Sequence, residues 1–208
     1  DGRLNDLPLG LSGVTEVTNA PLSAVNLELH SGDNSFNIAG TATETLALDW
    51  QLQVPQLQQV WQGLEGALAG QGSMGGTIER PELEGEVNGR QISLQSEDSS
   101  VILQSLQVTA NAAAANNDIK LSLGAVSMQS SAANNAAQPI LERATLSLVG
   151  TPAQHTVNAD LSLVDADVTL ELAGGVSAVT WNGILRSSSV TGSYGKWHKA
   201  RAIPLDYE

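Results

Sequence analysis

The 208-residue chain contains no cysteine, which excludes a disulfide framework, a thiolate zinc site and a cysteine nucleophile. Basic residues are scarce, since nine Lys and Arg stand against 22 Asp and Glu, a formal net charge of −13. Because phosphate binding needs clustered Lys and Arg, this balance argues against a nucleic-acid partner. Aromatic residues are also few, with four Trp, two Tyr and one Phe. Because aromatics are so few, the apolar interior is expected to be aliphatic. Enzyme pockets and protein hot spots, in contrast, usually recruit aromatics.

Long apolar runs are missing as well. No stretch approaches the ~18 consecutive apolar residues of a membrane helix, and the first residues lack the basic and apolar regions of a signal segment. With 41% hydrophobic and only 15% charged residues, the chain is nevertheless expected to fold. A length of 208 suits a single all-β unit or one section of a longer protein.

The chain does contain an apolar alternation with a period of two, which is typical of β-strands with one buried face. Roughly a dozen such segments succeed one another, separated by turn residues such as Asn88-Gly89 and Gly174-Gly175. The residues expected to share the apolar side, and therefore to line any groove, are Val25, Leu27, Leu29, Leu46, Leu48, Trp50, Leu52, Ile119, Leu121, Leu123, Leu161, Leu163, Val168, Leu170 and Leu172.

Three segments depart from this alternation. Apolar residues after Pro55 have helical spacing, which predicts at most one short helix near residues 56–63, with a strand after it. The Ala/Asn/Ser-rich stretches near 110–117 and 130–138 lack apolar alternation and are predicted to be loops.

The pattern therefore predicts an all-β, antiparallel-type meander. It is compatible with a sandwich, a barrel or an elongated, curved sheet, and periodicity alone does not choose among them. The scarcity of bulky rings leaves room for a continuous apolar channel, but an ordinary closed core remains an alternative.

Motifs for catalysis or for cofactor and metal binding are weak. The glycine pattern at residues 70–75 resembles a dinucleotide-binding loop, but residues 76–81 are typical of the rest of a strand and then a turn, where that loop needs a helix. The histidines, His30, His155 and His198, lie far apart and show no metal-ligand spacing, so we expect surface or hydrogen-bonded strand histidines. Glu82, Glu84 and Glu86 alternate along one strand face, as solvated carboxylates do. We therefore expect no enzyme activity, no cofactor and no metal.

Three glycine-rich pieces carry a resemblance to a known family. The segment 61–89 has the recurring glycine-and-proline strand pattern of that family. A second stretch over 150–161, 170–174 and 181–185 agrees with the same pattern. The last stretch, 195–207, contains Gly195-Lys-Trp197 and ends in Leu205-Asp-Tyr207. In this order the pieces resemble the TamB family of proteobacterial envelope proteins, over about two-thirds of the chain.

This resemblance implies a particular architecture. TamB-like proteins have an N-terminal membrane anchor and a long, U-shaped, taco-like β-sheet with an apolar groove, which crosses the periplasm toward the outer membrane. Residues 1–208 would then be a single internal section of that body. The family partners with TamA, an outer-membrane barrel protein, through a segment nearer its C-terminus. With related AsmA-like proteins, it is implicated in bringing phospholipid to the outer membrane.

The leading hypothesis is thus a section of a periplasmic conduit whose groove holds phospholipid acyl chains, without a membrane span of its own. One alternative is a chaperone-like scaffold that binds β-strands of outer-membrane proteins together with a TamA-type partner. A purely structural spacer is a further alternative.

Overall fold

The structure is a computed structural model. It describes residues 2–5, 7–17, 22–96, 99–113, 116–130, 137–177, 180–193, 195–198 and 201–207. The strands are β1 (Gly2–Leu4), β2 (Leu7–Val17), β3 (Leu22–Ser31), β4 (Asn34–Ala42), β5 (Leu46–Val54), β6 (Leu64–Gly76), β7 (Pro81–Gln95), β8 (Ser99–Ala113), β9 (Asn116–Leu123), β10 (Val126–Ser130), β11 (Gln138–Thr151), β12 (Gln154–Leu163), β13 (Ala166–Ser177), β14 (Thr180–Gly192), β15 (Gly195–His198) and β16 (Ile203–Tyr207).

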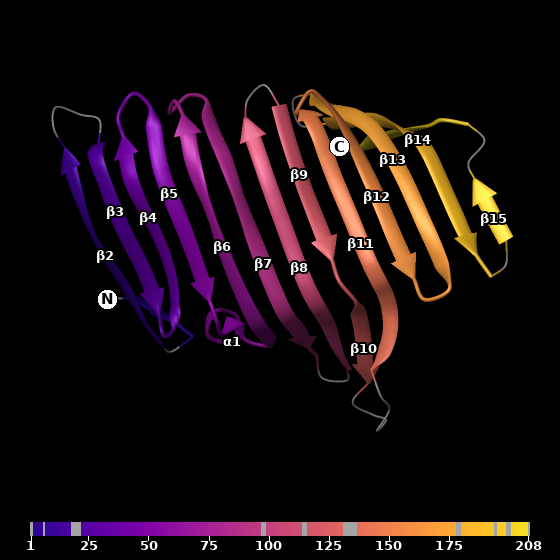
Figure 1. Cartoon of the computed structure of the whole chain (residues 1–208), viewed down its shortest axis with the longest axis horizontal. Helices are drawn as coiled ribbons and strands as arrows, with labels where there is room; N and C mark the ends of the chain where they lie inside the picture. Colours follow the sequence, from indigo (N-terminus) through magenta and orange to yellow (C-terminus); the bar gives the residue numbers. More distant parts are fainter. Residues whose placement is uncertain are drawn as a thin grey trace.

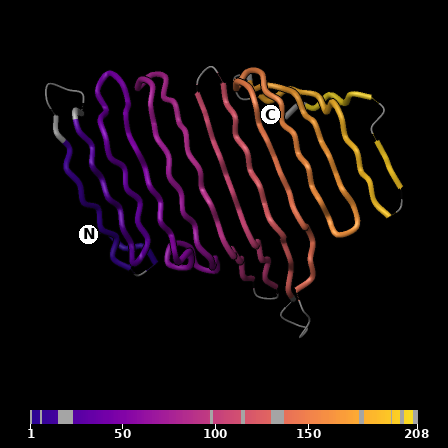
Figure 2. Tube along the Cα trace, in the orientation of Figure 1, coloured from indigo at the N-terminus to yellow at the C-terminus, as the bar shows by residue number. Residues whose placement is uncertain are grey.

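All sixteen strands belong to one antiparallel sheet. Most strands that are consecutive along the chain also pair with each other, so the sheet advances in sequence order from β2 to β14, and β15 and β16 both pair with β14 (Figure 1). β9 and β10 both lie between β8 and β11 and form two halves of one interrupted strand. The all-β, antiparallel prediction is confirmed, and the Cα trace shows a single layer (Figure 2).

The predicted short helix is confirmed as α1 (Leu57–Val60), with β6 beginning soon after it. The loop prediction near 110–117 was wrong for residues 110–113 and 116–117, which lie in strands, while residues 114–115 lie outside the described residues. Ala110 and Ala112 continue β8 opposite Gly85 and Leu83, and β9 starts at Asn116. Of the second predicted loop, near 130–138, Ser130 ends β10 and Gln138 begins β11, while residues 131–136 lie outside the described residues.

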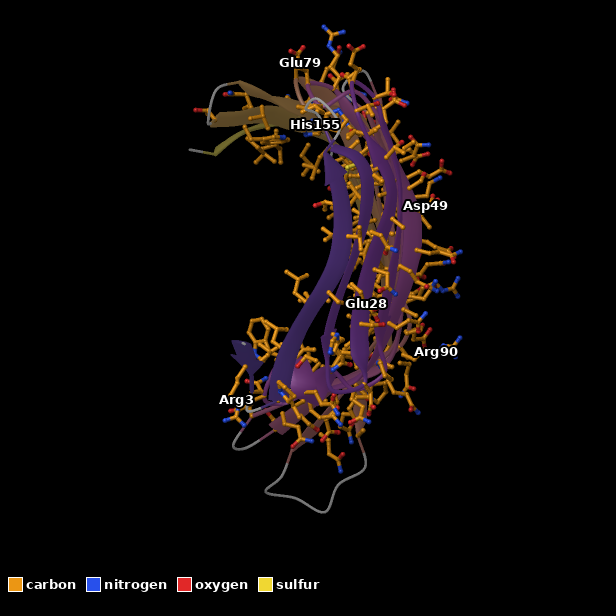
Figure 3. The ribbon with its side chains drawn as sticks, turned by 90° about the vertical axis from the view of Figure 1, so that its left-hand side faces the viewer. Arg3, Glu28, Asp49, Glu79, Arg90 and His155 are labelled. Atoms are coloured by element: carbon orange, nitrogen blue, oxygen red, sulfur yellow. The ribbon has the colours of Figure 1, made fainter. Side chains whose placement is uncertain are left out.

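The sheet is bent into a C-shaped cross-section, with a concave and a convex face (Figure 3). Irregular pairings lie at similar heights on several strands: at Gly66 in β6, at Gln91 in β7, between β9 and β10 at Gly124, and at Glu142 in β11. Bulges bend the strand that carries them and increase its twist. We call Gly66, Gln91, Gly124 and Glu142 the bend line, because together they turn the lower part of the sheet.

The sheet does not close on itself. Its accessible surface is 13455 Å², whereas a compact globular protein of the same mass exposes roughly 9,200 Å². Among the residues whose side chains the structure describes, the only buried apolar ones are Val25, Leu48, Val54, Leu57 and Ala144. The sandwich, the barrel and the closed core, which the periodicity left open, are therefore not the architecture of this chain.

Candidate functional site

The fifteen residues predicted to share an apolar side do share one face of the sheet. Side chains of directly paired residues project from the same face, so the strand register decides this point. One continuous row crosses ten strands and consists of Leu29, Phe36, Leu52, Gly70, Val87, Val108, Leu121, Leu146, Ala159 and Leu170. The other predicted residues lie in neighbouring rows of the same face. This face is apolar across most of the sheet.

The apolar face is the concave one. Asp49 and Arg90 project from the convex side in Figure 3. Because side chains alternate along β5, Leu48 and Trp50 project from the opposite, concave side. We call this concave apolar face the trough.

The trough is lined but not filled. Leu48 and Val25 are each 8% exposed, whereas Leu29 is 38% and Leu163 is 37% exposed, although all four belong to the same face. The prediction missed several residues that the register adds to the lining, including Phe36, Ile38, Val87, Val108 and Leu146. Each of them shows the same alternation within its strand, which is the signal that would have found them.

The glycine pattern at residues 70–75 has a structural role in the trough floor. It lies within β6, with no helix after it, so the geometry of a dinucleotide loop is absent. Instead the Trp50 ring lies over this part of the sheet. A Cβ added at Gly72 would lie 2.7 Å from the ring, and one at Gly85 would lie 2.4 Å from it. Because Gly72 and Gly85 have no side chains, the flat Trp50 indole can pack directly against the backbone of the sheet there.

The convex face is polar. Glu84 and Glu86 lie there, opposite Ser73 and Gln71 of β6, as the sequence predicted for a solvated outer face. A shallow hollow of about 420 Å³ lies over this area and is also lined by Asp118 and Lys120, whose charged groups are 3.4 Å apart. Nowhere in the described ranges do three or more His, Asp or Glu side chains gather in a way that would hold a metal ion.

His155 is a hydrogen-bonded strand histidine near the upper rim of the trough (Figure 3). It lies in the same register row as Gly150 and Gly174 and is 9% exposed. The Trp181 indole N–H donates to its Nε2 over 2.9 Å, and its Nδ1 lies 3.1 Å from the Thr151 carbonyl oxygen. Both ring nitrogens are therefore engaged within the protein. His30 and His198 are exposed.

α1 lies at one rim of the trough, at the lower ends of β5 and β6 in Figure 1. Leu57 is 5% exposed there, and the polar side chains of the helix bind the turn between β3 and β4. Beside α1 the trough deepens into a hollow of about 160 Å³. No helix in the described part of the chain is long and apolar enough to cross a membrane.

These features define an open, curved, single-layer antiparallel sheet with an apolar concave face and a polar convex face. The family model that matches the chain is described as TamB, N-terminal domain, and it covers residues 1–208. The chain belongs to the TamB family. Searches of curated proteins and of solved structures found no match.

Proposed function

We propose that the trough holds the acyl chains of phospholipids and forms a section of a conduit between the inner and outer membranes. The observation that carries this proposal is the unbroken row from Leu29 to Leu170, ten strands wide, on a face that is open to solvent. A soluble protein seldom exposes so large an apolar surface unless a partner or ligand covers it.

The energetics suit a hydrocarbon ligand. Burying an acyl chain gains about 0.8 kcal/mol for each methylene, without any directional bond. Headgroups remain in water outside the trough. Because aliphatic walls fix no single lipid in place, they favour movement along the trough over tight capture. This role needs no catalytic residue, no cofactor and no metal, and we propose that the chain is not an enzyme.

Membership of the TamB family supports the remaining parts of the proposal. We place the section in the periplasm of a Gram-negative cell envelope, within a longer protein that contributes to outer-membrane biogenesis. Its protein partner there is a TamA-like outer-membrane barrel, which contacts the longer protein outside this section.

Photo-crosslinking tests the conduit with matched pairs of neighbouring residues. Crosslinkers at Leu48 and Leu170 project into the trough, whereas Asp49 and Thr169 are their neighbours on the convex face. We expect phospholipid adducts in cells at Leu48 and Leu170 and none at the two controls. Adducts with protein alone at Leu48 and Leu170, or equal lipid capture at all four positions, would contradict the proposal.

The free edge of the sheet favours a second candidate function. On its outer side β2 pairs with β1 only over Leu7–Leu9, and no other described strand pairs with that edge. Unpaired backbone groups can add a strand from another chain, as a chaperone-like scaffold for outer-membrane proteins requires. Saturable binding of outer-membrane β-strand peptides without lipid, abolished by a proline at Leu11, would favour this candidate over the conduit.

A further inference from the structure

The hollow beside α1 differs from the rest of the trough because the helix borders it at the rim through Val60. Its apolar lining comes from β1 to β5 and from α1, and consists of Leu4, Leu9, Leu29, Phe36, Leu52, Val54 and Val60. Its volume of about 160 Å³ is close to that of a dry protein cavity that accepts a benzene-sized molecule. The hollow therefore has room for about six carbon atoms.

A network of polar side chains holds α1 against the turn between β3 and β4. The Gln59 side-chain oxygen accepts hydrogen bonds from the Asp33 backbone N–H, at 3.2 Å, and from the Asn34 amide, at 3.0 Å. The Gln56 amide donates to the Asp33 carboxylate at 2.8 Å. The Asn5 amide donates to the backbone carbonyl oxygen of Gln59 at 3.2 Å and so ties the turn after β1 to the same helix.

The polar residues around the hollow offer no anchor to a ligand. His30 and Ser35 alternate with Leu29, Ser31 and Phe36, so their side chains project from the convex face. The Asn34 amide is bound to the Ser31 carbonyl and to Gln59. The Ser31 hydroxyl has no described hydrogen-bond partner, but its oxygen is buried and so not exposed to a ligand in the hollow.

This lining decides between the possible occupants. An ordered water molecule needs two to four polar partners, and a peptide brings backbone groups that must be hydrogen-bonded. The described residues that line the hollow supply neither. A hydrocarbon needs no partner, and because α1 borders the hollow at the rim, an acyl chain that lies across the trough toward α1 ends in the hollow.

We propose that the hollow receives the terminal methyl end of an acyl chain, so that each lipid at this place lies across the trough with its tail toward α1 and its headgroup toward the opposite rim. This inference rests on the proposed function, since it assigns an orientation to lipids that the trough must first bind.

Two phospholipid probes test the orientation in the intact protein. One carries a diazirine at the last carbons of its acyl chain, and the other carries it next to the ester. Labelled residues are identified by mass spectrometry of peptides. We expect the terminal probe to label Leu52 and Val60 severalfold more than the ester-proximal probe does.

A variant that fills the hollow, compared with a matched control variant, tests the site a second time. Val60→Trp places a large side chain at the hollow, whereas Val149→Trp makes the same change at a similarly exposed position on the convex face, opposite Asp118. Terminal-probe labelling of Leu52 should fall severalfold in Val60→Trp and stay unchanged in Val149→Trp. Should Val60→Trp misfold, the comparison of the two probes on the unchanged protein still decides the question.

The outcomes separate this inference from the proposed function. Labelling of trough residues such as Leu170 by both probes, with none at the hollow, overturns the hollow as an acyl-end site and leaves the conduit standing. Equal labelling of the hollow by both probes overturns the orientation. An absence of labelling anywhere in the trough overturns both proposals.

Discussion

The Trp181 indole N–H donates a hydrogen bond to Nε2 of His155 over 2.9 Å, and this bond joins β14 to β12 across the intervening β13. Since Nε2 accepts, the ring proton of the neutral histidine lies on Nδ1 and is donated to the Thr151 carbonyl. The Trp181 ring lies over two glycines, since a Cβ at Gly174 would approach it to 2.5 Å and one at Gly183 to 2.3 Å. The C-terminal strands, gold in Figure 3, curve over the concave side in this region.

Trp181→Phe is expected to destabilise the chain by about 1–3 kcal/mol, because it leaves the buried Nε2 of His155 without a donor. Urea unfolding measures the loss, and a double-mutant cycle with His155→Phe isolates the hydrogen bond. We expect a coupling energy of about 0.5–3 kcal/mol. Trp61→Phe is the control, because Trp61 is 69% exposed and its change should stay within about 0.5 kcal/mol. Additive effects of the two substitutions would show that the bond contributes nothing.

Gly85→Ala is expected to cost about 1–3 kcal/mol, since the added methyl group meets the Trp50 ring and forces it off the trough floor. Gly75→Ala is the matched control, because its Cβ would come no closer than 4.0 Å to its nearest neighbour. That variant should be neutral or slightly stabilising. Denaturant unfolding measures both, and Trp50→Leu should restore part of the stability lost in Gly85→Ala. Equal effects of the two alanines would refute the steric account.

Ser31 and Asn34 are buried neighbours at the same turn, and their substitutions should have opposite effects. The Ser31 hydroxyl is buried without a described hydrogen-bond partner, so Ser31→Ala should be neutral or stabilise the chain by up to ~1 kcal/mol. Asn34→Ala should cost about 1–3 kcal/mol, because it removes the partner of the Gln56 N–H and of the Gln59 side chain. Thermal unfolding of both variants checks the pair, and a large loss in Ser31→Ala would reveal a partner for its hydroxyl.

The two faces of this sheet were predictable because side-chain alternation is a local property. Leu46, Leu48 and Leu52 fix the face of β5 whatever the neighbouring strands do, and the register then aligns that face with Leu121 and Leu170. The short helix was predictable for the same reason, since its spacing and the preceding proline are local signals.

The openness of the sheet was not predictable from alternation, because a barrel, a sandwich and a trough bury the same alternate residues. Curvature depends on the bend line, where Gln91 adopts a left-handed backbone (φ 48°). Glutamine rarely adopts this conformation, so the sequence carries no signal for it. The error near 110–117 has a different cause. Ala and Asn have weak strand propensity, but the backbone ladder between β7 and β9 extends the strand through Ala110 and Ala112, since strand propensity depends on context.

Gln91 also supplies the last prediction, because its backbone stores strain at the bend line. A left-handed conformation costs a residue with a side chain roughly 1–2 kcal/mol, whereas glycine adopts it freely. Glycine's greater flexibility in the unfolded chain costs about 0.5–1 kcal/mol in return. Gln91→Gly should therefore leave stability unchanged or raise it by up to ~1 kcal/mol. The matched control is Gln107→Gly in the regular, exposed part of β8, which should lose about 0.5–1 kcal/mol. Denaturant unfolding of the two variants measures the difference, and an equal loss in both would show that the bend at Gln91 is unstrained and that the curvature of the trough is set elsewhere.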